Sequence, residues 1–349
     1  MPPASPEAPR LLSGIRVLDL TTDVAGAYCA LQFAKCGADV DRIDGDEPPS
    51  GWAVYLDAYL HAGKNRTRGG RDLAGLQAAA GAYDAVIGDP DLPWADLAGH
   101  LRDGAVTATV DPFGETGPYR DWRGTELVFA SAGGATGYTR APDGEPVFGF
   151  GHRYEMLAGL YLFTAACAAL GGEPGPGEPR VPAIRVSAME TVASVLPYLT
   201  TQYVYNGSLS TVEQSGPRYT GACRDGYVVI YAGGPWTDIV AMFERPELDG
   251  DARFATPGAR FRNEAELGRM FADWCGARTV AEVVAAADRA NVAICPAVGL
   301  ADVLGDEQLA LRDGWEPVEV PGVGTGRAPR EPYVVNRWRT AGIAAKENA

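Results

Sequence analysis

Histidine and positive charge are both scarce in this 349-residue sequence. The three histidines, His61, His100 and His152, are too few and too scattered for a zinc site with imidazole ligands, so we expect no bound metal. Acidic residues number 45 against 30 basic ones, which gives a formal net charge of -15. Because nucleic acid and anionic membranes are bound by positive surfaces, neither is an expected partner.

Targeting and membrane-spanning patterns are also missing. The first residues, Met1–Arg10, are rich in proline and alanine without an apolar run, so no signal peptide is expected. No segment approaches the roughly 20 apolar residues that cross a bilayer. None of the six cysteines forms a C-x-x-C pair, and we interpret them as reduced side chains of a cytoplasmic protein.

Several common catalytic motifs are absent. The sequence has no G-x-S-x-G nucleophile elbow and no Walker loop. The first predicted strand is not followed by G-x-G-x-x-G, which disfavours redox chemistry on a dinucleotide. These absences disfavour nucleotide redox and Ser-His chemistry.

What is present is an alternation of apolar strands and helices. Residues Gly14–Leu20 form an apolar run typical of a buried parallel strand, Ala25–Lys35 have helical spacing, and Ala38–Ile43 form the next strand. Such a βαβ unit predicts a right-handed crossover and a parallel sheet. Further strands at Ala82–Gly88 and Ala105–Val110 predict an open, doubly wound α/β sheet.

The pattern changes along the second half of the chain. Helices are predicted at Glu126–Gly134 and Glu155–Leu170, followed by a strand at Ala183–Ser187. After Pro197 a smaller α+β domain is expected, with a strand at 226–231 and helices at 236–243, 265–275 and 280–290. The tail from Trp315 onward is predicted to hold short strands. The length fits two domains, or one large domain with an insertion.

Two places are candidates for chemistry. The turn Thr21–Gly26 joins the end of a strand to the start of a helix, where N–H groups favour anions; it also fits a plain turn with a helix cap. Glu155 begins the long apolar helix and is the favoured catalytic residue, although an acid in a first turn also complements the helix dipole. His152, three residues earlier, would share its face and give an acid/base pair, or it is simply a surface histidine.

Two short basic stretches stand out in this acidic chain. Tyr119 follows Pro118 and precedes Arg120 and Arg123, while Lys64 opens a run that continues through Arg66, Arg68 and Arg71. Either stretch fits a phosphate contact, and each equally fits an ordinary solvated surface.

Several segments together, in order, resemble family III CoA-transferases, which include formyl-CoA transferase, carnitine CoA-transferase and the α-methylacyl-CoA racemases. The resemblance covers residues 11 to 335. It is carried by LLSGIRVLDLTTDVAGAYCALQFAKCGADVDRID, FGETGPYRDWRGTELVFASAGGATGYT, EMLAGLYLFTAACAAL, IRVSAMETV, GYVVIYAGG and ANVAICPAVGLADVLGDEQLALRDGW.

The resemblance implies a Rossmann-like large domain, a small α+β domain and an interlocked homodimer. The corresponding ranges are 11–195 for the first part of the large domain, 196–220 for a linker, 221–300 for the small domain, and 301–349 for a second linker and the C-terminal return. A small carboxylate or thioester would be the partner molecule, with no nucleic acid or membrane involved.

The resemblance also implies site residues. CoA or an acyl-CoA would be the substrate, with contacts from Val24, Ala25, Lys64, Arg66 and Tyr119. The catalytic carboxylate falls on Glu155, where most members have Asp, and it would form an anhydride and then a thioester. Glycine turns at Gly133-Gly134 or Gly233-Gly234 would stabilise oxyanions.

The chain departs from the family at several positions. The stretch Gly88–Trp94 carries acids where the family has an Arg that meets CoA. An Asp of the family is replaced by Glu126, and the racemase His just before it by Thr125, which disfavours racemase chemistry.

Three hypotheses follow. The first is CoA transfer with Glu155 as nucleophile. The second is acid/base catalysis by Glu155 and His152 on a non-CoA or carrier-bound substrate in specialised biosynthesis, and the third is a non-catalytic subunit that supports an active partner.

Overall fold

The computed structural model describes residues 10–45, 47–69, 72–139, 141, 144–172, 181–207, 218–231 and 234–335. Its contacts divide the chain into a large unit, Met1–Pro197 with Ala310–Ala349, and a small unit, Tyr198–Leu309. Each unit has its own hydrophobic core.

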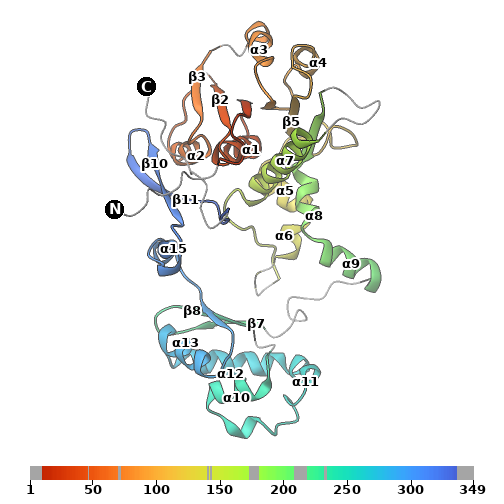
Figure 1. The fold of residues 1–349 in the computed structure, drawn as a ribbon. Helices are drawn as coiled ribbons and strands as arrows, with labels where there is room; N and C mark the ends of the chain where they lie inside the picture. Colours follow the sequence, from red (N-terminus) through yellow and green to blue (C-terminus); the bar gives the residue numbers. More distant parts are fainter. Residues whose placement is uncertain are drawn as a thin grey trace, which may run out of the picture. The chain divides into compact units, whose positions relative to one another are not determined.

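A six-stranded parallel sheet forms the centre of the large unit (Figure 1). The strand order is β3-β2-β1-β4-β5-β6, so the order reverses between β1 and β4. The strands are β1 (Arg16–Leu20), β2 (Asp39–Asp44), β3 (Asn65–Arg68), β4 (Ala85–Gly88), β5 (Val106–Asp111) and β6 (Ala183–Ser187). The prediction of a parallel α/β sheet is confirmed. In such sheets, ligands bind beyond the carboxyl ends of the strands where the order reverses.

Both faces of this sheet are covered, as the continuous apolar runs of its central strands predict. On one face the core contains Val17 and side chains of α1 (Val24–Lys35) and α7 (Arg153–Gly171). On the other face Leu18 packs into a second core. The helices α3 (Leu73–Ala80) and α4 (Trp94–Ala98) contribute to that second core.

Shorter helices complete the large unit. They are α2 (Ala53–Leu60), α5 (Glu126–Ala132), α6 (Ala135–Tyr138) and α8 (Ala188–Ser194). The segment 196–220, expected to be a linker, contains the helix α9 (Pro197–Asn206) and the start of a strand at Arg218.

The helix α7 has the length and hydropathy of a membrane-spanning segment, which corrects the expectation that no segment does. The helix has 19 residues and a mean hydropathy of 1.3. In this fold Ala158, Leu162 and Ala166 of α7 are completely buried in the core of the large unit. These apolar side chains of α7 pack against α1 and the sheet.

The small unit is an antiparallel sheet with helices packed on one face. The strands β7 (Arg218–Ala222), β8 (Tyr227–Tyr231) and β9 (Ile294–Pro296) pair in the order β7-β8-β9. In β8, Val228 and Ile230 are buried in the core, whereas the alternate side chains are exposed. The helices are α10 (Trp236–Phe243), α11 (Pro257–Arg262), α12 (Glu264–Gly276), α13 (Val280–Arg289) and α14 (Leu300–Leu304), with a 3-10 turn at Pro246–Leu248.

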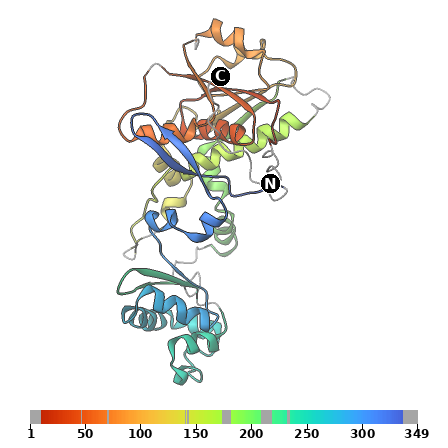
Figure 2. The same cartoon turned by 60° about the vertical axis from the view of Figure 1, so that its left-hand side comes forward.

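The C-terminal segment belongs to the large unit after Ala310. The helix α15 (Glu307–Leu311) is followed by the antiparallel hairpin β10 (Trp315–Val320) and β11 (Gly324–Pro329), which lies beside α2 (Figure 2). The buried ammonium of Lys35 joins this segment to α1, because it lies 3.0 Å from a carboxylate oxygen of Glu316 and 2.7 Å from one of Glu331. A buried cation with two carboxylates is costly to break, so it fixes the return of the chain.

Candidate active site

Glu155 lies in the first turn of α7, and its side chain is 14% exposed. The Nδ1 atom of His152 lies 2.5 Å from Oε2 of Glu155, within hydrogen-bond distance. The predicted pair is therefore brought together by the structure. His152 itself is 42% exposed, so one side of the pair faces solvent.

A second carboxylate, that of Glu126, holds the start of α7. Glu126 is the first residue of α5 and is 4% exposed. Its oxygens accept hydrogen bonds from the backbone N–H of Tyr154 at 3.0 and 3.1 Å and from that of Glu155 at 3.0 Å. Because 28 residues separate Glu126 from Tyr154, no local sequence pattern indicates this contact.

The helices α1 and α7 pack side by side in the large unit (Figures 1 and 2). Gly159 lies one turn after Glu155, and a Cβ added there would overlap the carbonyl oxygen of Ala25. Further along, the rings of Phe33 and Phe163 meet at 4.9 Å between centroids. Gly159 lies against Ala25, and the later residue Phe163 lies against the later residue Phe33. The two helices therefore run in the same direction and begin at the same end. Glu155 is therefore near the β1–α1 turn, where Val24 and Ala25 were predicted to contact CoA.

The β1–α1 turn is itself acidic. Asp23 is the N-cap of α1 and accepts a 2.8 Å hydrogen bond from the N–H of Gly26. The N–H and the hydroxyl of Thr22 both donate to Asp89, which follows β4. Burial raises the pKa of Asp23 to about 7, and the neighbouring charge of Asp89 adds to the effect. The predicted anion loop is thus capped by a carboxyl group of this chain.

A cleft of about 730 Å³ opens at the carboxyl ends of β1, β4 and β5. This is the edge of the sheet where the strand order reverses and where ligands of such folds bind. Tyr119 packs on Trp122, which lines the cleft, with 4.2 Å between ring centroids. The lining residues are Thr22, Asp23, Asp89, Pro90, Asp91, Val110, Asp111, Pro112, Arg120, Asp121, Trp122, Arg123 and Gly124.

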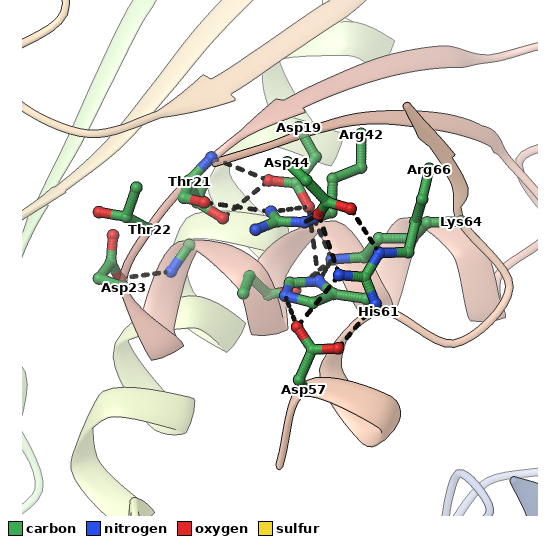
Figure 3. A network of polar contacts seen from close by, with 12 residues as sticks. Asp19, Thr21, Thr22, Asp23, Arg42, Asp44, Asp57, His61, Lys64 and Arg66 are labelled. Atoms are coloured by element: carbon green, nitrogen blue, oxygen red, sulfur yellow. Dashed lines mark hydrogen bonds and ion pairs between the residues drawn. The ribbon is translucent and has the colours of Figure 1, made fainter. Parts of the chain in front are cut away.

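Lys64 does not lie in the position that a phosphate contact needs. Its ammonium is completely buried and donates to Asp19 at 2.8 Å, to the carbonyl of Ala27 at 2.9 Å and to Nδ1 of His61 at 3.2 Å (Figure 3). These three bonds use all its hydrogens. Burial lowers the pKa of His61 to about 2, and the charges of Lys64 and Arg42 add to this, so the ring accepts the bond as a neutral imidazole.

Asp19 is the centre of this buried network (Figure 3). Burial alone would raise its pKa, but Lys64 and Arg42, at 2.8 and 3.0 Å, bring the pKa of Asp19 well below its usual value. The N–H and hydroxyl of Thr21 also donate to the same carboxylate. The network joins β1, β2 and the end of α2, and it fixes the turn that follows β1.

Arg66 is also neutralised within the chain. Its guanidinium binds Asp44 through two nitrogens at 2.9 and 3.0 Å and Asp57 at 2.7 and 3.2 Å. Lys64 and Arg66, which were predicted to contact CoA, are therefore both paired with carboxylates of this chain. Both cations serve instead to hold β2, β3 and α2 together.

The predicted oxyanion loops differ in what the structure says of them. The N–H of Gly133 donates to Phe129 at 2.8 Å, and that of Gly134 donates to Ser131 at 3.2 Å, so these amides are already used. Gly134 has a φ of 96°, which favours glycine, and it allows the break between α5 and α6. Gly234 is an exposed residue of the small unit, and Gly233 lies outside the described residues.

Metal binding has no support from side-chain geometry in the described part of the chain. No group of three or more His, Cys, Asp or Glu side chains there is arranged to hold an ion. The expectation of a metal-free site stays a prediction.

Comparisons with known proteins agree with one another. The sequence model described as CoA-transferase family III matches residues 100–346. Succinyl-CoA–D-citramalate CoA-transferase of Chloroflexus aurantiacus is 26% identical, over 92% of this chain and 87% of that protein. The beta subunit of succinyl-CoA–L-malate CoA-transferase from the same organism is 24% identical, over 90% of this chain and 84% of its own.

A solved structure shares the fold. The crystal structure of a CAIB/BAIF family protein from Brucella suis superposes with a TM-score of 0.81, at 23% identity and with 96% of each chain covered. The resemblance drawn from the sequence is therefore confirmed. The chain belongs to CoA-transferase family III and is an enzyme of that class.

Proposed function

We propose that this enzyme moves CoA from an acyl-CoA to a small carboxylic acid, with the carboxylate of Glu155 as nucleophile. The observation that carries the proposal is the placement of Glu155. It is a largely buried carboxylate, bound by His152 at 2.5 Å and located at the end of α7 that lies beside the β1–α1 turn. A fixed carboxylate at this end of the sheet is what attack on a bound thioester requires.

The reaction can be written in four balanced steps. A Glu155 oxygen attacks the thioester carbonyl, the C–S bond breaks, and CoA leaves as a thiolate with an acyl–glutamyl anhydride left behind. The thiolate then attacks the glutamyl carbonyl, and the donor acid leaves as a carboxylate. The acceptor carboxylate attacks the resulting glutamyl thioester, the C–S bond breaks, and an acceptor acyl–glutamyl anhydride forms with release of the thiolate. The thiolate finally attacks the acceptor acyl carbonyl of this anhydride, which gives the new acyl-CoA and frees the Glu155 carboxylate.

No proton is gained or lost in this sequence, so a general acid or base is not needed. His152 then acts through its hydrogen bond, which orients one oxygen of Glu155 and leaves the other to react. The comparisons do not favour the two alternatives, acid/base chemistry on a non-CoA substrate and a non-catalytic subunit.

Succinyl-CoA is the donor to test first, because both relatives above are named for it. The acidic cleft at the ends of β1, β4 and β5 is the proposed location for CoA, since it is the large opening at the reversal of strand order. Arg120 and Arg123 are the cations that line it, in place of Lys64 and Arg66.

Trapping tests the nucleophile directly. The protein is incubated with succinyl-CoA without acceptor, treated with hydroxylamine or borohydride, and digested for mass spectrometry. We expect the modification on Glu155 and none in Glu155→Gln. Glu319→Gln, which changes an exposed carboxylate on β10, is the control and retains the adduct on Glu155. A modification elsewhere, or none with an active protein, overturns the proposal.

We also propose the interlocked homodimer that the family resemblance implies, and a Rossmann-like assignment for the large unit. Exposed aromatic side chains on α9, with Tyr198 at 71% and Tyr205 at 83%, support a further protein contact. Light scattering of the purified protein tests the dimer, and a monomeric mass would contradict it.

A further inference from the structure

The side chain that caps α7 comes from a distant helix. An N-cap residue normally accepts a hydrogen bond from the N–H two or three positions later. His152 occupies the N-cap position of α7 but makes no capping hydrogen bond in the part of the chain that the structure describes. Its ring is used on Glu155 instead. The N–H groups of Tyr154 and Glu155, which a local cap would have satisfied, donate to Glu126.

Glu126 is in turn held by its own surroundings. It is 4% exposed at the start of α5, and Phe129 of the same helix is buried in the core. At the other end of α5, Gly133 packs so closely on Val192 of α8 that a Cβ would overlap that side chain. The helix α5 therefore gives Glu126 a fixed support, and the three hydrogen bonds transfer that support to α7.

The hydrogen bonds from Glu126 also affect the position of the Glu155 carboxylate. Glu155 contributes both one of the bound N–H groups and the carboxylate, so its backbone is tied to Glu126 while its side chain is tied to His152. Without the hydrogen bonds to Glu126, the first turn of α7 is no longer held in place, and the carboxylate of Glu155 moves with it. A misplacement of about 1 Å costs roughly a hundredfold in rate.

We propose that Glu126 is a positioning residue for CoA transfer. It caps α7 from outside the helix, which fixes the nucleophile and leaves His152 free to orient it. The inference rests on the proposed function, because it assumes that Glu155 is the residue that reacts.

Two substitutions at Glu126 test this. Glu126→Gln keeps the length and one acceptor oxygen, whereas Glu126→Ala keeps neither. We expect kcat to fall roughly tenfold in the first and a hundredfold in the second, with KM for the acyl-CoA little changed. The backbone amides of Tyr154 and Glu155 should exchange hydrogen faster in both variants.

Asp72→Ala is the matched control, because Asp72 also caps a helix of the large unit with a carboxylate, accepting from Gly75 at 2.8 Å. It should lower the melting temperature and leave kcat unchanged. If Glu126→Gln behaves like Asp72→Ala in kcat and in exchange at 154 and 155, the inference is overturned. The trapping experiment on the unaltered protein separates the two ideas: an adduct on Glu155 with an unaffected Glu126→Gln refutes only the positioning role, whereas an adduct at another residue refutes the proposed function.

Discussion

Gly159→Ala should disturb the site without touching any of its polar groups. The added Cβ would overlap the carbonyl oxygen of Ala25 and lie 3.1 Å from its carbonyl carbon and 3.2 Å from the nitrogen of Cys29. Those atoms are backbone of α1 and cannot rotate away. The helices α1 and α7 must therefore separate by roughly 1 Å to restore ordinary contact distances.

Two opposing effects determine how much Gly159→Ala changes the free energy of unfolding. Replacing Gly by Ala inside a helix stabilises it by about 1 kcal/mol, whereas overpacking in a tight core costs about 1–3 kcal/mol. The net change in the free energy of unfolding is thus between about zero and a loss of 2 kcal/mol. Activity should suffer more, since Glu155 is one turn from the clash and a shift of this size costs roughly a hundredfold in kcat.

Gly171→Ala gives the matched control in the same helix, because nothing lies within 4 Å of its added Cβ. Thermal unfolding and steady-state kinetics of CoA transfer are measured for both variants. We expect Gly171→Ala to keep full activity and an equal or higher melting temperature. If Gly159→Ala matches it in both measurements, the close packing of α1 and α7 does not position Glu155 and the reasoning is refuted.

Three further outcomes are expected. Asp19→Asn leaves two buried cations without their carboxylate and should lower the free energy of unfolding by about 3–5 kcal/mol. Asp39→Asn, at an exposed ion pair, should lower it by at most about 1 kcal/mol. Equal losses in the two variants would contradict the importance of the buried network. The raised pKa of Asp23 means that the folded chain holds this proton more tightly than the unfolded chain between the ordinary value of 3.8 and about 7. Stability should therefore fall as pH rises through that window, and Asp23→Asn should flatten this part of the melting-temperature profile; an unchanged slope would show that the group does not titrate there. His152→Ala should lower kcat by roughly ten- to a hundredfold with little change in KM. His100→Ala, at an exposed side chain, should change neither kcat nor KM. Equal activity of the two variants would argue against orientation of Glu155 by His152.

Local patterns were sufficient for much of the architecture. The apolar run before Leu20, the helix that ends at Lys35 and the strand after it are found as predicted. The helix predicted at Glu155–Leu170 is also found, with bounds of Arg153–Gly171. The helices α10, α12 and α13 of the small unit also match their periodic segments. These elements bury apolar faces with a regular period, so their sequences carry the signal themselves.

Elements without an apolar period were not predicted. The strand β3 reads NRTR and has no buried residue, and only its pairing with β2 makes it a strand. The helix α9 has no buried residue in its unit, so the segment looked like a linker.

The sequence alone determined the family, the parallel α/β sheet and the proximity of His152 to Glu155, since residues three apart at the start of a helix are neighbours. Tertiary structure decided which charges are available. It buried Lys64 on Asp19 and bound Arg66 to Asp44 and Asp57. It also brought Glu126 across 28 residues to the first amides of α7. Pairing between charges depends on which strands and helices become neighbours, and this is set by the packing of the whole sheet, which no local pattern contains.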